Sequence, residues 1–355
     1  MSTWENIELN RTLAVPNHGQ VLNGLDARKR QLSDAIFSEV SLVGACFSDC
    51  DLSHAKFIQC DLTEADFSNA VLDHTQFVKC KMVKVRMSAQ MHTHNSWVEC
   101  ELPASDWSHT QLLVSSITNS NLESAQFSSA TFKRSTLLGN QYNGVSLANT
   151  ELLNSVISPA DFRQVNLSGV RAQGVIFSEG NFQHQALTGI QLQQCSMQQA
   201  DFSHSNLHGA NLTQSNFHQA RFIQSNLVNA NAAQALFLAA QLEQVDLSDA
   251  NLQSAIFQQA QLSDCQFDRA NLKMTIWNKS KQQNVSFSSA NLHYSRFHHV
   301  CGDRLDFTRA ILDASQFHNT CLINSTFLNA SRRQAGNTNQ LRLAEEASTL
   351  NLELS

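Results

Sequence analysis

Bulky apolar residues recur at every fifth position through most of this chain. Residues 199–217 read QADFSHSNLHGANLTQSNF, in which Phe202, Leu207 and Leu212 follow one another at this spacing, each with a small residue two places before it. A period of five matches neither the 3.6-residue period of a helix nor the two-residue period of a plain strand. The repeat is therefore a structural unit of its own.

The period runs from Leu32 to Phe327 without an insertion or a deletion. It covers 60 positions, of which 57 are apolar, and all 21 phenylalanines of the chain occupy it. The position two residues earlier is nearly always a small residue. Alternation of large and small side chains is what a narrow, tightly packed interior requires. We interpret both positions as inward-facing.

The chain resembles the pentapeptide-repeat proteins. Their motif, A-(D/N)-L-x-x, occurs here as Ala210-Asn211-Leu212 and again from Ala250 and Ala270, and the resemblance covers about residues 31–330. It implies an all-β fold, a right-handed quadrilateral β-helix in which four pentads make one coil. About 15 coils, with strands about 4.8 Å apart, would give a rod of roughly 70 Å.

Both ends depart from the repeat. Residues 1–30 are expected to form an N-terminal cap, residues 31–330 the β-helix and residues 331–355 a C-terminal tail. In the tail, Leu341, Ala344 and Ala347 have helical spacing after the candidate N-caps of residues 337–339, which predicts a short helix. This helix is expected to cover the open end of the β-helix, and dimerisation through it is the alternative.

Residues 20 apart should stack on successive coils. We therefore expect Phe237, Phe257 and Trp277 to form one aromatic column, and similar columns to fill the interior and leave no room for a ligand. The pattern weakens in a few coils, which we interpret as irregular and not as sites. The residues concerned are Gln90, His92 and Asn95; Asn140 and Tyr142; Ala172 to Gln185 and Ile190; and Gln282, Gly302 and Leu305.

Composition narrows the classes of function. Charged residues are 15% of the chain, the net charge is -6 and the pI is about 6.1, so the basic footprint of a nucleic-acid binder is missing. Basic Lys81 and Arg86 come one coil after acidic Asp61 and Asp66, which favours local pairing.

The sequence contains neither a membrane span nor a signal peptide. A cytoplasmic protein is expected, with unconventional secretion as the alternative.

Motifs of catalysis are missing from the sequence. The Asp residues before the core position follow the repeat spacing and are expected on solvated faces, without a concave site between them. No G-x-S-x-G, glycine-rich phosphate loop or H-E-x-x-H occurs. We expect no enzyme activity and no cofactor.

Cysteine and histidine columns are the remaining candidates for chemistry. Cys60, Cys80 and Cys100 should stack inward as inert core residues, and His54, His74 and His94 should form an outward ladder. A possible zinc set on one corner consists of His298, Cys301, His318 and Cys321. Zinc requires ligand distances of about 2.0 to 2.3 Å, and solvated surface is the favoured interpretation of all these outward groups.

An apolar outer column is the candidate for protein contact. Leu236, Ile256 and Ile276 are expected to stack on the outside of the aromatic face, with Leu238 beside Leu236. Contiguous exposed apolar surface tends to mark an interface, either with a partner or between two copies of the chain. The alternative is that aliphatic residues simply suit a strand.

The leading functional hypothesis is a non-enzymatic protein-binding or scaffold rod, whose partner is unknown. The family resemblance supplies two alternatives. One is a DNA mimic that modulates a type II topoisomerase, and the other is a secreted bacterial effector or an accessory of a secretion system.

Overall fold

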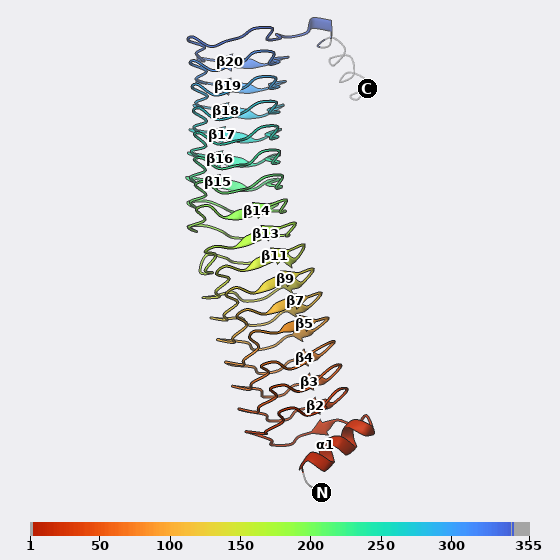
Figure 1. The fold of residues 1–355 in the computed structure, drawn as a ribbon. Coiled ribbons are helices and arrows are strands. Elements are labelled where there is room, and N and C mark those ends of the chain that lie inside the picture. The colour runs from red at the N-terminus through yellow and green to blue at the C-terminus, as the bar shows by residue number, and fades with distance from the viewer. Residues whose placement is uncertain (1–2, 342, 344–355) are drawn as a thin grey trace. The chain divides into compact units, whose positions relative to one another are not determined.

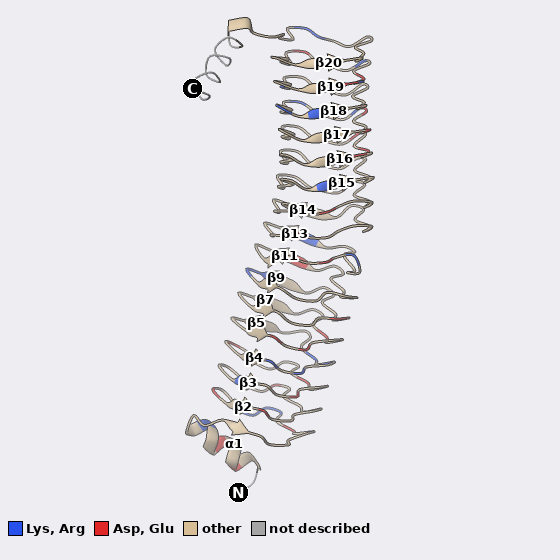
Figure 2. Ribbon diagram, turned by 180° about the vertical axis from the view of Figure 1, so that it is seen from behind, with Lys and Arg blue, Asp and Glu red and all other residues tan. Residues whose placement is uncertain are grey.

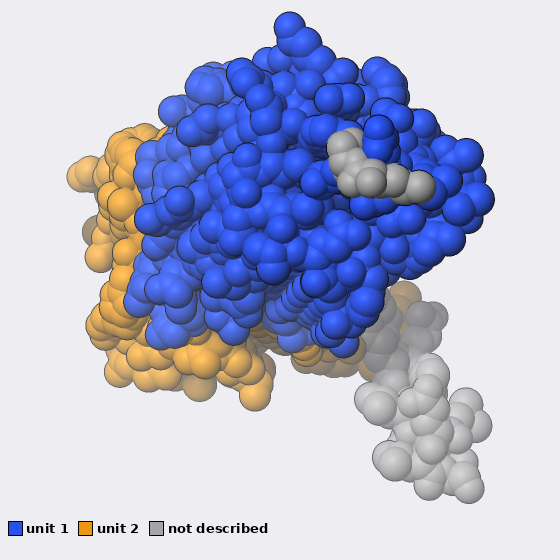
Figure 3. All heavy atoms as spheres, turned by 90° about the horizontal axis from the view of Figure 1, so that it is seen from below, with its two compact units in different colours: residues 1–181 blue, residues 182–355 orange. Residues whose placement is uncertain are grey.

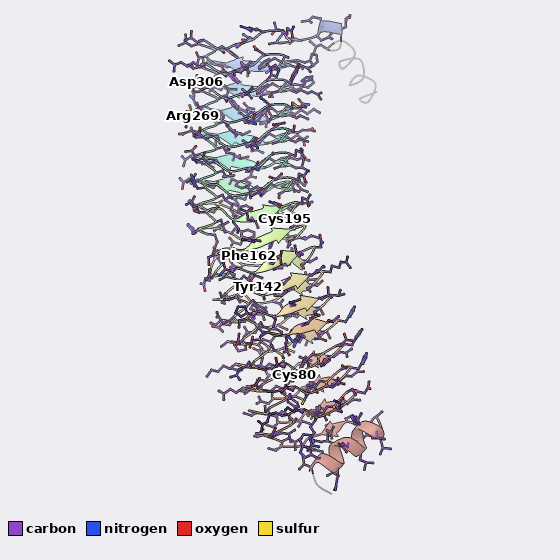
Figure 4. All side chains as sticks on the ribbon, viewed as in Figure 1. Cys80, Tyr142, Phe162, Cys195, Arg269 and Asp306 are labelled. Atoms are coloured by element: carbon purple, nitrogen blue, oxygen red, sulfur yellow. The ribbon has the colours of Figure 1, made fainter. Side chains whose placement is uncertain are left out.

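The computed structural model describes residues 3–341 and residue 343. The chain divides into two compact units, residues 1–181 and 182–355, which Figure 3 colours separately. Each unit is a parallel β-solenoid of five-residue segments, four to a coil, and the units together hold about 15 turns (Figure 1). The expected β-helix is therefore confirmed.

Nearly every segment turns through a residue in the left-handed region, with Pro159 and Gln164 as the exceptions. In the segment from Leu32, the N–H of Ala35 donates to the carbonyl of Leu32 at 3.1 Å, and Asp34 between them has a φ of 63°. This conformation costs a residue other than glycine roughly 1–2 kcal/mol. The N–H of Asp34 also donates to the carbonyl of Ser53 in the next coil at 2.9 Å. Stacking of coils thus offsets the cost of the turns.

Neutral side chains join the coils on the outside. The amide of Gln194 donates to Gln214, and that of Gln214 donates to Gln234, each at 2.8 Å. Such amide ladders are stable wherever identical residues stack in register. They explain why glutamine and asparagine replace charged residues on this surface.

The N-terminal helix precedes the first coil. Helix α1 spans Thr3–Thr12, and the guanidinium of Arg30 lies 4.5 Å from the ring centroid of its Trp4. Strand β1 (Asn17–His18) comes next in the chain, with Asn17 paired to Phe37. Coils thus begin upstream of residue 31, where the cap was expected to end. The five-residue pattern does not reveal this early start, because Asn17 and Ala27 occupy positions where later coils have bulky apolar residues.

Two parallel sheets run along unit 1. The first contains β1 (Asn17–His18), β2 (Ile36–Ser38), β3 (Lys56–Ile58), β4 (Gln76–Val78), β6 (Ser96–Val98), β8 (Ser116–Thr118), β10 (Thr136–Leu138) and β12 (Val156–Ile157). The second contains β5 (Met91–Thr93), β7 (Gln111–Leu113), β9 (Thr131–Lys133), β11 (Glu151–Leu153) and β13 (Arg171–Gln173). Each strand is short because the chain turns a corner after every segment.

One sheet runs along most of unit 2. It contains β15 (Arg221–Ile223), β16 (Gln241–Glu243), β17 (Gln261–Ser263), β18 (Lys281–Gln283), β19 (Cys301–Asp303) and β20 (Cys321–Ile323). Strand β14 (Gln191–Gln193) also lies in unit 2 but is not part of this sheet. All five neighbouring pairs of strands in the sheet are parallel and in register at a spacing of 20 residues. The outward residues of this sheet therefore form straight columns.

Stacked rings fill the interior of both units. In unit 1 the rings of Phe37 and Phe57 stack with centroids 5.0 Å apart, and in unit 2 those of Phe237 and Phe257 stack at 4.7 Å. Rings from other sides of the coil meet these stacks edge-on. The expected aromatic columns are confirmed.

The irregular coils of unit 1 accommodate polar groups by internal hydrogen bonds. His92 is completely buried between the rings of Trp97 and Trp107, and its Nε2 lies 3.4 Å from the carbonyl oxygen of Met87. The hydroxyl of Tyr142 donates to the carbonyl of Leu137 at 3.2 Å. Burial lowers the pKa of His92 to about 4, so the imidazole is neutral at ordinary pH.

Coils also continue beyond the expected boundary at residue 330. Gly336 still bridges to Gln316, although Arg332 occupies the core position and its guanidinium lies 4.6 Å from the ring centroid of Phe327. A helical turn begins after Asn339, whose Oδ1 accepts from the N–H of Leu341 at 3.1 Å. The N-cap is confirmed. The rest of the predicted helix, including Ala344 and Ala347, lies outside the described residues.

Candidate functional site

A groove of about 540 Å³ lies along the outer face of strands β15–β20 in unit 2. Six coils contribute to it, five of them through residues on both sides of the inward side chain and the first through Ile223 alone. The lining residues are Ile223, Gln241, Leu242, Glu243, Gln261, Leu262, Ser263, Lys281, Gln282, Gln283, Cys301, Gly302, Asp303, Cys321 and Ile323. Pockets that hold ligands have volumes of this order, and here the floor is a sheet.

The groove carries charges of both signs on neutral polar walls. Lys281 is the only basic residue among those that line it, and Glu243 and Asp303 are the only acidic ones. Figure 2 shows basic segments in β15 and β18, which contain Arg221 and Lys281. A single lysine between two acids does not make a phosphate track.

The irregular coil predicted at Gln282, Gly302 and Leu305 lies directly under the groove. A Cβ atom on Gly302 would come within 2.6 Å of Cδ1 of Leu305 and 2.9 Å of Cδ2 of Leu322. Glycine is required because Leu305 fills the space that a bulky side chain takes up in other coils. The groove and the core defect thus belong to the same face.

Gln282 brings a polar side chain into this floor. Its side chain is buried, and its Nε2 donates to Oγ of Ser280 at 3.0 Å, but its Oε1 is buried without a hydrogen bond. An unsatisfied buried acceptor costs about 1–3 kcal/mol. The chain tolerates that cost directly beneath the groove.

The predicted apolar column forms on the neighbouring face. Leu236 bridges to Ile256, and Ile256 bridges to Ile276, so the three stack on consecutive coils. Leu236 is 38% exposed, whereas Ile256 and Ile276 are partly buried. Only one corner, at Ala239 with a φ of 53°, separates Leu238 from Gln241 on the wall of the groove. The apolar column and the groove therefore adjoin along one corner of unit 2.

The four residues of the possible zinc set do not converge. His298 and His318 were expected to point outward, but they are only 7% and 3% exposed. Nε2 of His298 lies 3.0 Å from Oε1 of Gln316, and Nδ1 of His318 accepts from the N–H of Asn339 at 3.1 Å. The chain that follows the last coil covers this histidine, which the repeat pattern could not reveal.

Their cysteine partners lie around the corner. Cys301 and Cys321 are exposed and pair in register on β19 and β20, at the end of the groove. Within the described residues, no three ligand atoms of His298, Cys301, His318 and Cys321 lie within 4.8 Å of one another. The corner between the two columns keeps the imidazoles apart from the thiols.

The inward cysteines are core residues, as predicted. Cys60 and Cys80 are buried, and their thiols donate to the carbonyls of Phe37 and Phe57 at 3.4 and 3.3 Å. Burial raises the pKa of Cys265 to about 12. A thiol in that range is protonated and a poor nucleophile.

Opposite charges pair between coils in unit 1. Arg86 lies 2.8 Å from Asp66 and Lys81 lies 3.3 Å from Asp61, each one coil apart. The second oxygen of Asp66 accepts from the backbone N–H of Ser68 at 2.9 Å. The local pairing predicted from the sequence is confirmed, and it interrupts the acidic surface that a mimic of duplex DNA would need.

Two repeat families match the chain by sequence. The model of the pentapeptide repeat region matches residues 205–277, and that of pentapeptide repeats (8 copies) matches residues 21–53, 50–88, 176–214 and 186–222. These segments contain the five-residue period and the turns described above. This chain is a pentapeptide-repeat protein. No curated protein matches it significantly.

Solved structures with the same kind of repeat are distant in sequence. Trypsin-treated QnrB1, a plasmid-mediated fluoroquinolone resistance protein, is 17% identical, with 57% of this chain and 92% of that chain covered and a TM-score of 0.36. HetL of Nostoc sp. strain PCC 7120, which is involved in regulating heterocyst differentiation, is 16% identical, with coverages of 93% and 94% and a TM-score of 0.17. A pentapeptide-repeat protein of the Arabidopsis thaliana thylakoid lumen is 21% identical, with coverages of 42% and 66% and a TM-score of 0.11. At these identities the likeness concerns the fold alone.

Within the described residues, no helix has the length and apolar character needed to cross a membrane.

The groove was not predicted from the sequence. Its signal was the loss of the bulky side chain at Gln282 and again at Gly302, one coil later in the same column. Two defects that stack on one face indicate a local change of surface more strongly than either defect alone.

Proposed function

We propose that this pentapeptide-repeat protein is a non-enzymatic scaffold that binds an extended segment of a protein partner in the groove of β15–β20. The groove itself carries the proposal, because six coils present it as a continuous surface with charges of both signs. The rigid stack of coils holds this surface without a partner, so little ordering would oppose binding.

The apolar column strengthens the case for a protein partner. Leu236 and Ile256 provide aliphatic surface one corner away from the polar wall of the groove. Protein interfaces combine an apolar centre with a polar rim in this way. A partner that follows the groove and crosses the corner would bury both.

The charge pattern argues for this function over the alternatives. Acidic Asp61 and Asp66 are paired with basic residues of the next coil, which speaks against mimicry of duplex DNA. A binding role requires no catalytic group, and the buried thiols and the neutral His92 fit structural roles. The proposal names the chemistry of the partner, a polypeptide with mixed charge.

Site-specific photo-crosslinking tests the proposal. A benzoyl-phenylalanine placed at Gln261, which lines the groove, should form a discrete adduct with a protein of the native host. The matched control is Gln253, which is also an exposed glutamine of unit 2 but lies two segments away from the groove's segment on the 20-residue coil. Adducts from Gln261 that do not form from Gln253 support the proposal. Equal adducts from both positions, or none from Gln261, reject it.

A further inference from the structure

We infer that His54, Asp73 and His74 in unit 1 form a binding site for a divalent first-row transition-metal ion such as Zn²⁺. One ligand atom from each residue lies within 4.8 Å of the other two. Two imidazoles and a carboxylate are ligands that zinc accepts in proteins. This site is independent of the binding surface proposed for unit 2.

Backbone stacking holds the two imidazoles together. His54 and His74 occupy the same turn position on successive coils, with φ of 60° and 56°, and their rings stack with centroids 5.0 Å apart. The N–H of His54 donates to the carbonyl of Asp73 at 2.8 Å. The two ligands therefore come from adjacent coils that are already hydrogen-bonded to each other. An ion bound between them would link the two coils further.

The carboxylate of Asp73 is the third ligand. Its Oδ1 atom is buried and accepts no hydrogen bond of normal geometry, although it lies 3.1 Å from Nδ1 of His74 and 3.9 Å from Nδ1 of His94. A carboxylate oxygen that faces imidazole nitrogens is well placed to share a cation with them, and the Asp73 side chain as a whole is 45% exposed. A metal ion would supply that cation, with water completing the coordination.

The side chains are accessible to an ion from solution. His54 and His74 are exposed, and Asp73 is partly buried. An exposed site of three ligands binds a metal more weakly than a closed site of four, and it leaves positions open for water. The ligand atoms lie within 4.8 Å of one another, so the side chains have to shift for all three to reach one ion. Exposed side chains change rotamer readily.

Unit 2 contains a matched control. His184 and His204 occupy the same turn position one coil apart, each with a φ of 60°, and their rings stack at 4.8 Å. Among the described residues, no carboxylate joins this pair as a third ligand within 4.8 Å. The control thus reproduces the stacked imidazoles without the group that we infer completes the site.

Calorimetric titration of the full chain with Zn²⁺ tests the inference. The protein carries no histidine tag, and iodoacetamide blocks the exposed thiols of Cys301 and Cys321. We expect the wild type to bind one Zn²⁺ ion per chain. The affinity for this ion should be at least about 10-fold lower in His54→Gln and in Asp73→Asn, because each change removes one ligand. Gln occupies this turn position at Gln59 and Gln199, so His54→Gln should fold.

The matched substitution His184→Gln should leave zinc affinity and stoichiometry unchanged. As a second readout, Zn²⁺ should raise the melting temperature of wild type and of His184→Gln but not of Asp73→Asn, because an ion that binds only the folded state stabilises it. Full zinc affinity in Asp73→Asn, an equal loss in His184→Gln, or a wild type that binds no better than His54→Gln would each overturn the inference.

Discussion

The rings of Phe257 and Trp277 stack with centroids 4.3 Å apart and planes 6° from parallel, one coil above the other. Phe257 also stacks on Phe237 and is completely buried. Its replacement by alanine removes a ring from the middle of a continuous column. We expect Phe257→Ala to lower the free energy of unfolding by about 3–5 kcal/mol, as measured by chemical denaturation.

The control for this change is Gln253→Ala, at an exposed position of the preceding pentad. Substitutions at such surface positions usually stay within about 0.5 kcal/mol. Equal stability of Phe257→Ala and the control would contradict the assignment of Phe257 to the core.

Gly302 and Leu305 are coupled through shared space. A methyl group at residue 302 would come within 2.6 Å of Leu305, so Gly302→Ala should destabilise unit 2 by about 1–3 kcal/mol. Adding Leu305→Ala clears that space and restores the small residue found there in other coils. The double variant should therefore lose less stability than the two single changes added together. Strict additivity in the double-mutant cycle would show that the two sites do not interact.

His92 should make the stability of unit 1 depend on pH. Burial lowers its folded-state pKa from 6.5 to about 4, and the groups packed against it are the rings of Trp97 and Trp107 and the amide of Asn95. Below pH 6.5 the unfolded state binds a proton that the folded state does not. The stabilisation is thus fully present above about pH 6.5 and is lost as pH falls to about 4, by an amount on the order of 3 kcal/mol.

The comparison is His92→Leu, because leucine occupies the adjoining coils at Leu72 and Leu112. Denaturation curves between pH 7 and pH 4 should fall less steeply for this variant than for wild type. Parallel pH dependence in both proteins would show that His92 is not the group that titrates.

Most of the fold could be predicted from the sequence because a single rule repeats. A bulky residue such as Phe257 every fifth position, with a small one two places earlier, leaves only one way to pack the interior. The ends could not be predicted as well. Asn17 and Arg332 break the side-chain rule while the backbone still pairs with the neighbouring coil. Backbone hydrogen bonds, which carry no sequence signature, extend the coils past the recognisable repeat.

The surface was predicted less well than the core. Register placed Leu236 above Ile256 correctly, but it could not show that residues after the last coil cover His318. Nor could it show that the defects at Gln282 and Gly302 underlie a groove. The solvent exposure of a side chain depends on the neighbouring turns and on the tail. The repeat determines only whether its Cα–Cβ bond points inward or outward.

The apolar column gives a prediction about association. Replacing Leu236, Ile256 and Ile276 with asparagine should preserve the fold, because these side chains lie outside the core and asparagine occupies Asn216 one coil earlier in the same column. If two copies of the chain pair through this face, sedimentation should show a shift toward monomer in the triple variant. Partner capture should weaken instead if the face binds another protein. A variant with unchanged oligomeric state and unchanged partners would show that the column is not an interface.

The proposed groove is tested most directly by the dissociation constant of the crosslinked partner, once purified, for wild type and for Lys281→Glu. Lys281 is the only basic residue that lines the groove, so reversing its charge should weaken binding at least about 10-fold if the partner contacts it. Lys273→Glu is the matched control, because it reverses an exposed lysine of the same unit two segments away on the coil. The proposal predicts a large change for Lys281→Glu and almost none for Lys273→Glu. Equal dissociation constants for wild type and Lys281→Glu, or equal losses in both variants, would contradict it.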